Sequence, residues 1–321
     1  MKILVTGGAG FVGSHLCEKL LSQGHSVSVL DDVSTGTMAN LVHLQGRPGF
    51  RLVCDSTLNP KTLEEMLEDC DFVYHLAAAV GVKLIVNDPV NTIQTNIRGT
   101  EIVLHYANKW RRPVLFTSTS EVYGKSDKEK FSEDDNMVLG PTTHSRWSYA
   151  CSKAIDEFLA ISYHRKNKLP VIVVRLFNTV GPRQSPQYGM VLPTFVRQAL
   201  RGEPITVYGT GEQRRTFTYI DDVVFALTEL PKHPASFGQV YNVGGEQEIS
   251  IQSLAALVKE RSGSASSIVR IPYDQAYEPG FEDMPRRVPD ISKLSRAIGY
   301  RPSHSVPQIV DRVIEYFRAN P

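Results

Sequence analysis

The chain has 321 residues, 41% of them hydrophobic, and a formal net charge of +1 at pH 7. This length allows a sizeable core and two lobes, and the balanced charge argues against attraction to nucleic acid or an acidic membrane. The four scattered cysteines form no Cys-x-x-Cys pair, so we expect a reduced, cytoplasmic protein with no metal. The N-terminal apolar run stops too early for a signal peptide, and no window is long enough to span a bilayer.

A glycine-rich turn follows the first predicted strand, Ile3 to Val5. The turn, Gly7-Gly8-Ala9-Gly10-Phe11-Val12-Gly13, precedes a segment with helical spacing of leucines. In a strand-turn-helix unit, Gly7 permits the tight turn, Gly10 lets the backbone approach a pyrophosphate, and Gly13 allows close helix packing. The pattern predicts a dinucleotide site, with a glycine-rich turn that binds no ligand as the alternative.

The second predicted strand, Ser26 to Leu30, ends in two carboxylates, Asp31 and Asp32. Dinucleotide-binding folds carry at this distance the acid that binds the adenosine ribose. Such an acid repels a 2'-phosphate, so we expect NAD rather than NADP, with Asp31 preferred for the contact. A third strand, Arg51 to Cys54, ends at Asp55-Ser56, a candidate pair of adenine contacts.

The fourth predicted strand, Asp71 to Leu76, opens into the small residues Ala77-Ala78-Ala79. Small side chains at the carboxyl end of a parallel strand let a cofactor lie against the backbone. We interpret His75 as a buried core histidine. Helical spacing follows from Thr92 to Tyr106, so strands and helices alternate as in a parallel sheet with right-handed crossovers.

A further strand, Val114 to Phe116, leads into a polar cluster that begins at Thr117. In open parallel sheets, ligands bind at this carboxyl edge. Thr119 and Glu121 are two residues apart in a stretch with an extended pattern, which lets both side chains point to one side. The alternative for this cluster is ordinary turn chemistry.

Tyr149 and Lys153 are four residues apart, which places them one turn apart on one helix face. An ammonium beside the phenol lowers the tyrosine pKa, and a phenolate near neutral pH is a general base for a hydroxyl proton. The same helix has an apolar face from Ala154 to Leu159. With the Thr92 to Tyr106 helix, this face predicts a homodimer contact; the alternative is that both helices cover the sheet.

The composition and the pattern of predicted elements change after the sixth predicted strand, Val171 to Val174. Prolines and glycines become frequent, and a smaller lobe is expected to begin near Gly181. The fold class is therefore α/β: a Rossmann-type doubly wound parallel sheet with a smaller, mostly C-terminal α/β lobe. In that lobe the loop Gly211 to Arg215 follows a strand, and its arginines join Arg286 and Arg287. They are either solvated surface residues or recognise a diphosphate or carboxylate.

These segments together resemble the extended short-chain dehydrogenase/reductases that act on nucleotide-diphosphate sugars. The resemblance covers essentially the whole chain and is carried by G-G-A-G-F-V-G, S-T-S-E-V-Y-G, Y-A-C-S-K, R-L-F-N-T-V-G-P-R, the Gly211 to Arg215 loop and R-V-P-D-I at Arg287 to Ile291. It implies that Tyr149 takes the proton of a sugar 4'-hydroxyl while C4' gives hydride to NAD. Lys153 would bind the nicotinamide ribose and lower the Tyr149 pKa, and Thr119 would hydrogen-bond the 4'-oxygen.

The residues that follow Thr119 favour one reaction among those known in this family. Family 4,6-dehydratases carry Asp-Glu there, whereas this chain has Ser120 and so lacks that proton donor; simple 4-epimerases usually lack a carboxylate at the Glu121 position. Thr-Ser-Glu, the Arg287 motif and Arg146-Trp147 resemble the UDP-glucuronic acid decarboxylases. The resemblance implies C4' oxidation followed by decarboxylation to UDP-xylose or a UDP-4-keto-pentose. The alternatives are a UDP-sugar 4-epimerase, then a 4,6-dehydratase or a non-catalytic binding protein.

Within this interpretation, Arg287 orients the substrate carboxylate or stabilises an enolate, and Glu121 positions the sugar or manages protons near C5'. Asn178 and Arg215 would bind the diphosphate, and other lobe residues would frame the base. The segment between Thr179 and Phe195 departs from the xylose synthases at a place expected to contact substrate, which leaves the sugar and the decarboxylation open. The sequence also does not fix the base as uracil, or whether the 4-keto product is reduced before release.

The expected contacts and domains are as follows. Cofactor contacts are expected at Gly7, Gly10, Phe11, Val12, Gly13, Asp31, Asp32, Asp55, Ser56, Leu76, Ala77, Ala78, Ala79, Thr117, Tyr149 and Lys153. Substrate contacts are expected at Thr119, Ser120, Glu121, Tyr149, Asn178, Arg183, Val191, Leu192, Thr206, Tyr208, Arg215 and Arg287. Residues 1–180 plus roughly 216–248 form the NAD-binding domain, and roughly 181–215 plus 249–321 form a nucleotide-sugar-binding lobe. The expected partner is a UDP-sugar, with no nucleic acid or membrane.

Overall fold

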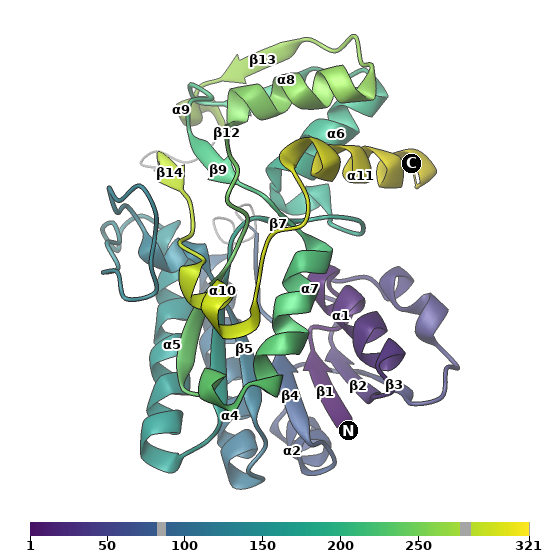
Figure 1. Cartoon of the computed structure of the whole chain (residues 1–321), viewed down its shortest axis with the longest axis vertical. Helices are drawn as coiled ribbons and strands as arrows, with labels where there is room; N and C mark the ends of the chain where they lie inside the picture. The colour runs from purple at the N-terminus through teal and green to yellow at the C-terminus, as the bar shows by residue number, and fades with distance from the viewer. Residues whose placement is uncertain (82–87, 277–283, 321) are drawn as a thin grey trace.

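The computed structural model describes residues 1–81, 88–276 and 284–320. Its centre is a seven-stranded sheet in the order β11-β6-β5-β4-β1-β2-β3, with every neighbouring pair parallel (Figure 1). The strands are β1 (Lys2–Thr6), β2 (Ser26–Asp31), β3 (Phe50–Cys54), β4 (Phe72–His75), β5 (Val114–Thr119), β6 (Val171–Leu176) and β11 (Gln239–Val243). The predicted Rossmann-type sheet is confirmed.

Helices cover both faces of the sheet because alternate strand residues point to opposite sides. On β1, Ile3 and Val5 join a buried cluster that includes α1 and α7, whereas Leu4 joins a second cluster with α2, α4 and α5. These helices are α1 (Phe11–Ser22), α2 (Pro60–Glu68), α4 (Pro89–Lys109), α5 (Trp147–Asn167) and α7 (Ile220–Glu229). The strands are therefore nearly continuous apolar runs, as their sequences predicted.

A smaller lobe lies beyond the carboxyl ends of the strands (Figure 1). Its elements are α6 (Val191–Arg201), β8 (Ile205–Tyr208), β9 (Arg214–Thr216), β12 (Glu248–Ser250), α8 (Ile251–Ser262), β13 (Ile268–Ile271), α9 (Tyr273–Ala276), β14 (Arg286–Arg287) and α11 (Val306–Ala319). The pair β7 (Thr179–Val180) and β10 (Thr218–Tyr219) connects the two parts, and α10 (Ser292–Ile298) packs near β11. The lobe is thus an α/β unit, as predicted.

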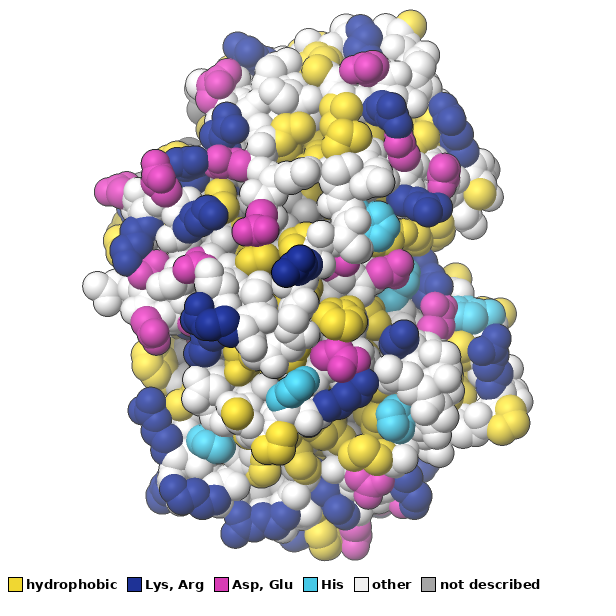
Figure 2. Space-filling view, in the orientation of Figure 1, with side chains coloured by type: hydrophobic (Ala, Val, Ile, Leu, Met, Phe, Trp, Pro, Cys, Tyr) yellow, Lys and Arg dark blue, Asp and Glu magenta, His cyan; other side chains and the backbone are white. Residues whose placement is uncertain are grey.

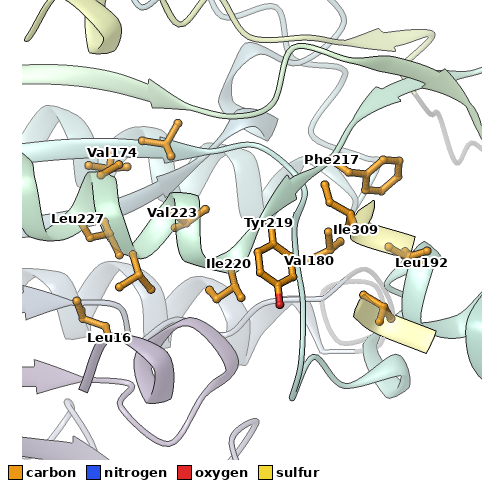
Figure 3. Packing of buried hydrophobic residues seen from close by; sticks show 14 of the residues in the cluster. Leu16, Val174, Val180, Leu192, Phe217, Tyr219, Ile220, Val223, Leu227 and Ile309 are labelled. Atoms are coloured by element: carbon orange, nitrogen blue, oxygen red, sulfur yellow. The ribbon is translucent and has the colours of Figure 1, made fainter. Parts of the chain in front are cut away.

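The core continues from the sheet into the smaller lobe. One buried cluster contains Leu16 of α1, Val174 of β6 and Leu227 of α7, together with Leu192 of α6 and Ile309 of α11 (Figure 3). On the outer surface, basic and acidic side chains are interspersed, as the balanced net charge leads one to expect (Figure 2). The shared core holds the small lobe in place over the sheet edge.

Two local expectations were wrong. Strand β5 ends at Thr119, and Glu121 lies in a short 3-10 helix (η3, Ser120–Tyr123) rather than in an extended stretch. The Thr119 hydroxyl caps that turn by accepting a hydrogen bond from the Glu121 backbone N–H at 3.2 Å. Arg214 and Arg215 lie in strand β9, not in a loop, because β9 pairs with β12 on one side and β14 on the other.

Candidate active site

A cleft of about 1090 Å³ lies between the carboxyl edge of the sheet and the smaller lobe. The strand order reverses at β1, whose neighbours are β2 and β4, and open α/β sheets bind ligands where the crossovers diverge in this way. The cleft brings together every predicted cofactor and substrate residue except Lys153. Residues from both parts of the chain therefore share one continuous space.

The glycine turn forms one wall of the cleft. Gly7 has φ 75°, and a Cβ there would lie 2.7 Å from the backbone nitrogen of Ala77. A Cβ on Gly13 would lie 2.1 Å from the carbonyl oxygen of Gly7, so the close approach of α1 requires a glycine. In the described structure, no side chain caps the N-terminus of α1. Its first N–H groups are therefore available to an anionic group such as a pyrophosphate.

Asp31 joins the end of β2 to the glycine turn. Its Oδ2 accepts a hydrogen bond from the Ala9 backbone N–H and its Oδ1 from that of Val33, both at 2.8 Å. Burial raises the pKa of Asp31, whereas Asp32 is exposed and accepts hydrogen bonds from Ser34. Both acids line the cleft. An uncapped helix N-terminus beside a β2 carboxylate is a donor and acceptor set that fits NAD.

The side chain of Asn96 holds the backbone of Ala79 in the small-residue segment after β4. The sequence patterns did not single out Asn96. Asn96 of α4 accepts a hydrogen bond from the Ala79 backbone N–H at 2.8 Å, and its amide donates to the Ala79 carbonyl and to Ser152 of α5, both at 3.3 Å. His75 is a buried core histidine, as predicted, with its ring nitrogens against Thr6 and Thr100. The Asn96 amide thus links the Ala77 to Ala79 segment, where cofactor contacts are expected, to α5, the helix that carries Tyr149.

Tyr149 lies at the centre of the cleft but is not activated by Lys153. The Thr119 side chain faces its phenol, and the pKa of Tyr149 is raised, by burial first and then by Glu121. The Lys153 ammonium lies 3.5 Å from a carboxylate oxygen of Asp156 and 3.9 Å from the ring centroid of Phe116. The expected lowering of the Tyr149 pKa is absent here, because the buried Asp156 carboxylate attracts the ammonium more strongly than a neutral phenol.

Glu121 is held between two arginines. Its Oε1 accepts a hydrogen bond from Arg287 Nη1 and its Oε2 from Arg146 Nη1, each at 3.2 Å. All three side chains are largely buried, and all three line the cleft. Arg146 was noted in the sequence only for its resemblance to relatives. Its position directly before the helix that carries Tyr149 is the signal that marks it as a site residue.

The smaller lobe supplies a second group of polar side chains. Strands β9 and β14 are parallel neighbours with Arg215 in register with Arg287, which brings the two arginines to the same wall. Arg287 Nη2 also donates to Asn178 Oδ1 at 3.2 Å, and the Asn178 amide donates to the Thr216 carbonyl. Arg183 lies at another part of the cleft, where its guanidinium donates hydrogen bonds to Ser14 Oγ and Glu18 Oε1 of α1. That contact places it beside the glycine turn.

The far end of the cleft is lined by Val191, Leu192, Thr206 and Tyr208. The sequence patterns did not identify Gln213 as a site residue. Its amide donates to the Tyr208 carbonyl and to the Tyr273 hydroxyl, both at 3.0 Å. These contacts join α9 to β8, so Gln213 and Tyr273 belong to the wall of this end.

A doubly wound parallel sheet with a Tyr-x-x-x-Lys helix beside its nucleotide cleft defines a protein of the short-chain dehydrogenase/reductase class. More particularly, the chain belongs to the NAD dependent epimerase/dehydratase family, whose model matches residues 3–244. NAD is accordingly its cofactor, in agreement with the fit of the glycine turn and Asp31.

Individual relatives cover nearly the whole chain. The sequence is 40% identical to a UDP-N-acetyl-alpha-D-glucosaminuronate decarboxylase of Bacillus cytotoxicus over 99% of this chain and 98% of that one. It is 37% identical to UDP-glucuronic acid decarboxylase 1 of Xenopus tropicalis, over 99% of this chain and 72% of the relative. The structure resembles a UDP-glucuronic acid 4-epimerase from Bacillus cereus, in complex with UDP-glucuronic acid and NAD, with a TM-score of 0.89, 30% identity and 99% coverage of both chains.

Along the described ranges, no helix has both the length and the apolar character needed to cross a bilayer.

Proposed function

We propose that this protein is an NAD-dependent decarboxylase of UDP-glucuronic acid or a closely related UDP-uronic acid. The observation that carries the proposal is the Arg146, Glu121 and Arg287 group beside Tyr149. Two guanidinium groups at that position suit a substrate that carries a carboxylate. Ser120 supports the same conclusion, because it offers no carboxylic acid to a departing 6'-hydroxyl. The decarboxylase relatives add independent support.

The first step depends on Tyr149 and Thr119. Both side chains line the cleft, and the Thr119 hydroxyl at the end of β5 faces the Tyr149 phenol, so both are placed to hold the 4'-oxygen of a sugar. Tyr149 would take the proton of the 4'-hydroxyl as its general base. Bound NAD supplies the acceptor for the hydride that leaves C4'. The product of this step is a ketone at C4' that lies β to the carboxylate.

The second step is the loss of carbon dioxide. The C5'–C6' bond breaks, and its electron pair moves toward C5' and the C4' ketone as an enolate. Arg287 and Arg146 would hold the carboxylate and stabilise the negative charge that develops. Glu121 keeps the two guanidinium groups at the same wall. A proton then adds at C5' to give a 4-keto-pentose.

The nucleotide would bind toward the smaller lobe. Arg215 and Asn178 lie beside Arg287 and would bind the diphosphate. Val191, Leu192, Thr206 and Tyr208 would frame the base. The relatives' names include two uronic acids that differ at C2, and we propose UDP-glucuronic acid as the first substrate to test.

The test is to incubate the protein with UDP-glucuronic acid or UDP-N-acetylglucosaminuronic acid, with and without added NAD. Proton NMR and mass spectrometry then follow the sugar nucleotide. Loss of carbon dioxide from either compound is the expected result, and a pentose or 4-keto-pentose product tells whether the ketone is reduced before release. Unchanged mass with a new anomeric signal would instead identify a 4-epimerase, the function named for a structural neighbour. No reaction with either acid would refute the proposal.

We also propose a homodimer formed through α4 and α5, which pack side by side. Their outer surface exposes Phe158 to 65%, Ile155 to 43%, Val90 to 63% and Ile93 to 37%. Large apolar side chains gathered on one surface are typical of an interface.

The cytoplasm is the proposed location. All four cysteines are free thiols, two of them exposed. Unpaired thiols on a surface are typical of a reducing compartment.

The domain division remains a proposal, supported by the topology. Strand β11 and helix α7 come from the later, 216–248 segment and complete the Rossmann sheet and its cover.

A further inference from the structure

A buried ion pair lies behind Tyr149. Lys153 is 2% exposed and Asp156 is fully buried, and they are one turn apart on α5. The ammonium lies over the ring of Phe116 and 3.5 Å from Asp156 Oδ2. Lys153 does not line the cleft, although Tyr149 does. Before a cofactor binds, the ammonium is therefore retracted from the space in which a nicotinamide ribose would lie.

Among the described residues, Lys153 is the cation that pairs with the Asp156 carboxylate. Neither of its oxygens accepts a well-formed hydrogen bond from the described part of the chain, although the Thr100 hydroxyl faces it. The next acid on the helix, Glu157, is already paired with Arg175, whose Nη2 lies 2.7 Å from Glu157 Oε2. Within residues 1–81, 88–276 and 284–320, no second cation is paired with Asp156 to replace Lys153 if the ammonium departs.

The other titratable groups around the pair do not substitute for Asp156. From β4, His75 is buried and neutral, since burial and the nearby Lys153 lower its pKa to about 3. On α5 itself, Tyr149 is protonated because burial raises its pKa. Glu121 and Arg287 act on Tyr149 from the cleft side. Near neutral pH, Asp156 is thus the group of this cluster whose protonation responds to the position of Lys153.

We propose that Asp156 is a positioning residue for Lys153: it holds the ammonium in the retracted place, and it takes up a proton when the ammonium moves to the cofactor ribose. This inference rests on the proposed function, because it takes Lys153 as the residue that binds the ribose of NAD.

The proton balance follows from burial. With Lys153 beside it, Asp156 already has a pKa raised to about 6 by burial. Departure of the ammonium removes the main favourable charge, so the pKa rises further and the carboxylate takes a proton from solvent near pH 7. The same movement brings a positive charge toward the cleft and Tyr149. NAD binding would then lower the Tyr149 pKa, which the retracted lysine does not. A proton that Tyr149 releases would offset the one that Asp156 takes up, so the Asp156 uptake is measured as the difference between the wild type and Asp156→Asn.

The test is calorimetric titration of the full-length protein, freed of bound nucleotide, with NAD. Measurements at pH 7 in buffers of different ionisation enthalpy count the protons exchanged. We expect the wild type to take up close to one proton per NAD more than Asp156→Asn does. Because uptake favours binding at low pH, the Kd for NAD should rise by up to about 10-fold per pH unit between about pH 6 and 8.

Three variants separate the possibilities. Asp156→Asn cannot take up a proton at this position, so its proton exchange is the reference, and its Kd should lose the rise with pH that Asp156 supplies. Lys153→Met leaves Asp156 already neutral at pH 7, so it should bind NAD more weakly and also without uptake at Asp156. Asp311→Asn is the matched control: this half-buried acid of α11 pairs with Arg261 and does not line the cleft, so the variant should behave as the wild type.

The outcomes are distinct. Equal proton exchange on NAD binding by the wild type and by Asp156→Asn would overturn the inference. If Asp156→Asn does not fold, the wild type and Lys153→Met decide the matter. If the wild type does not bind NAD at all, the proposed function fails rather than this inference.

Discussion

At the scale of single residues, the Tyr149 hydroxyl carries the proposed proton transfer. Tyr149→Phe keeps the buried ring and removes only the hydroxyl that faces Thr119. We expect kcat to fall by roughly 10²- to 10⁴-fold, the usual value of a general base, because no other group replaces the phenol. Steady-state turnover of UDP-glucuronic acid measures the loss, and unchanged NAD binding is the control. A variant within a few-fold of wild-type activity would rule out Tyr149 as the base.

Arg287 should act mainly on the decarboxylation step. Its guanidinium reaches Glu121 with one nitrogen and Asn178 with another, a geometry that the lysine ammonium cannot reproduce. For Arg287→Lys we expect carbon dioxide release to fall by roughly 10²- to 10³-fold, since one stabilising donor is lost. Formation of NADH, followed by its absorbance, should fall much less.

The neighbouring Arg286 provides the matched control for this experiment. Its guanidinium is more exposed and bonds Glu248, so Arg286→Lys should leave both steps nearly unchanged. Equal losses of NADH formation and carbon dioxide release in Arg287→Lys would mean that Arg287 acts in binding rather than in decarboxylation.

At the scale of elements, helix α1 depends on its close approach to the glycine turn. A Cβ at Gly13 would meet the Gly7 carbonyl oxygen at 2.1 Å, and both groups are backbone. We expect Gly13→Ala to lower the free energy of unfolding by about 1–3 kcal/mol, because the helix must move away. NAD affinity should fall with it, since the same movement opens the phosphate wall.

Denaturant unfolding and NAD titration check this prediction. Lys19→Ala, an exposed position on the same helix, is the control and should change neither quantity. Wild-type stability together with wild-type NAD affinity in Gly13→Ala would contradict the role given to the close approach.

Element boundaries also account for the local errors of prediction. The residues from Thr117 to Glu121 have an extended pattern, yet the chain turns at Thr119 because its own hydroxyl caps the turn. Arg214 and Arg215 follow glycines and so suggested a loop, but pairing with β12 and β14 makes them a strand. Local sequence does not reveal such pairing, because the partners are far away in the chain.

At the scale of the whole molecule, the proposed dimer should depend on Phe158. This side chain is 65% exposed on α5, so a charge there changes the outer surface without entering the core. If α4 and α5 form the interface, Phe158→Glu should dissociate the dimer. The interface would bury the new carboxylate without a hydrogen-bond donor or a cation to pair with it. Light scattering coupled to size-exclusion chromatography measures the mass.

The control for this variant is Phe225→Glu on α7, another exposed phenylalanine that lies away from the proposed interface. It should leave the dimer intact. A monomeric wild type, or a dimer unaffected by Phe158→Glu, would remove α4 and α5 as the interface.

The sequence by itself determined the α/β class, the nucleotide site and many of the residues that line the cleft. These features depend on short-range patterns: apolar strands, a glycine turn followed by a helix, an acid after the second strand, and Tyr149 four residues before Lys153. Each pattern is local, so it specifies an element and the residues at its end.

Only the tertiary structure decided which side chains meet and in which ionisation state. Glu121, Arg146 and Arg287 are brought together by η3, the start of α5 and β14, which are distant in the chain. The direction of the Lys153 ammonium, toward Asp156 rather than Tyr149, likewise depends on burial. Burial and charge proximity are properties of packing, and a spacing of four residues on a helix does not determine them.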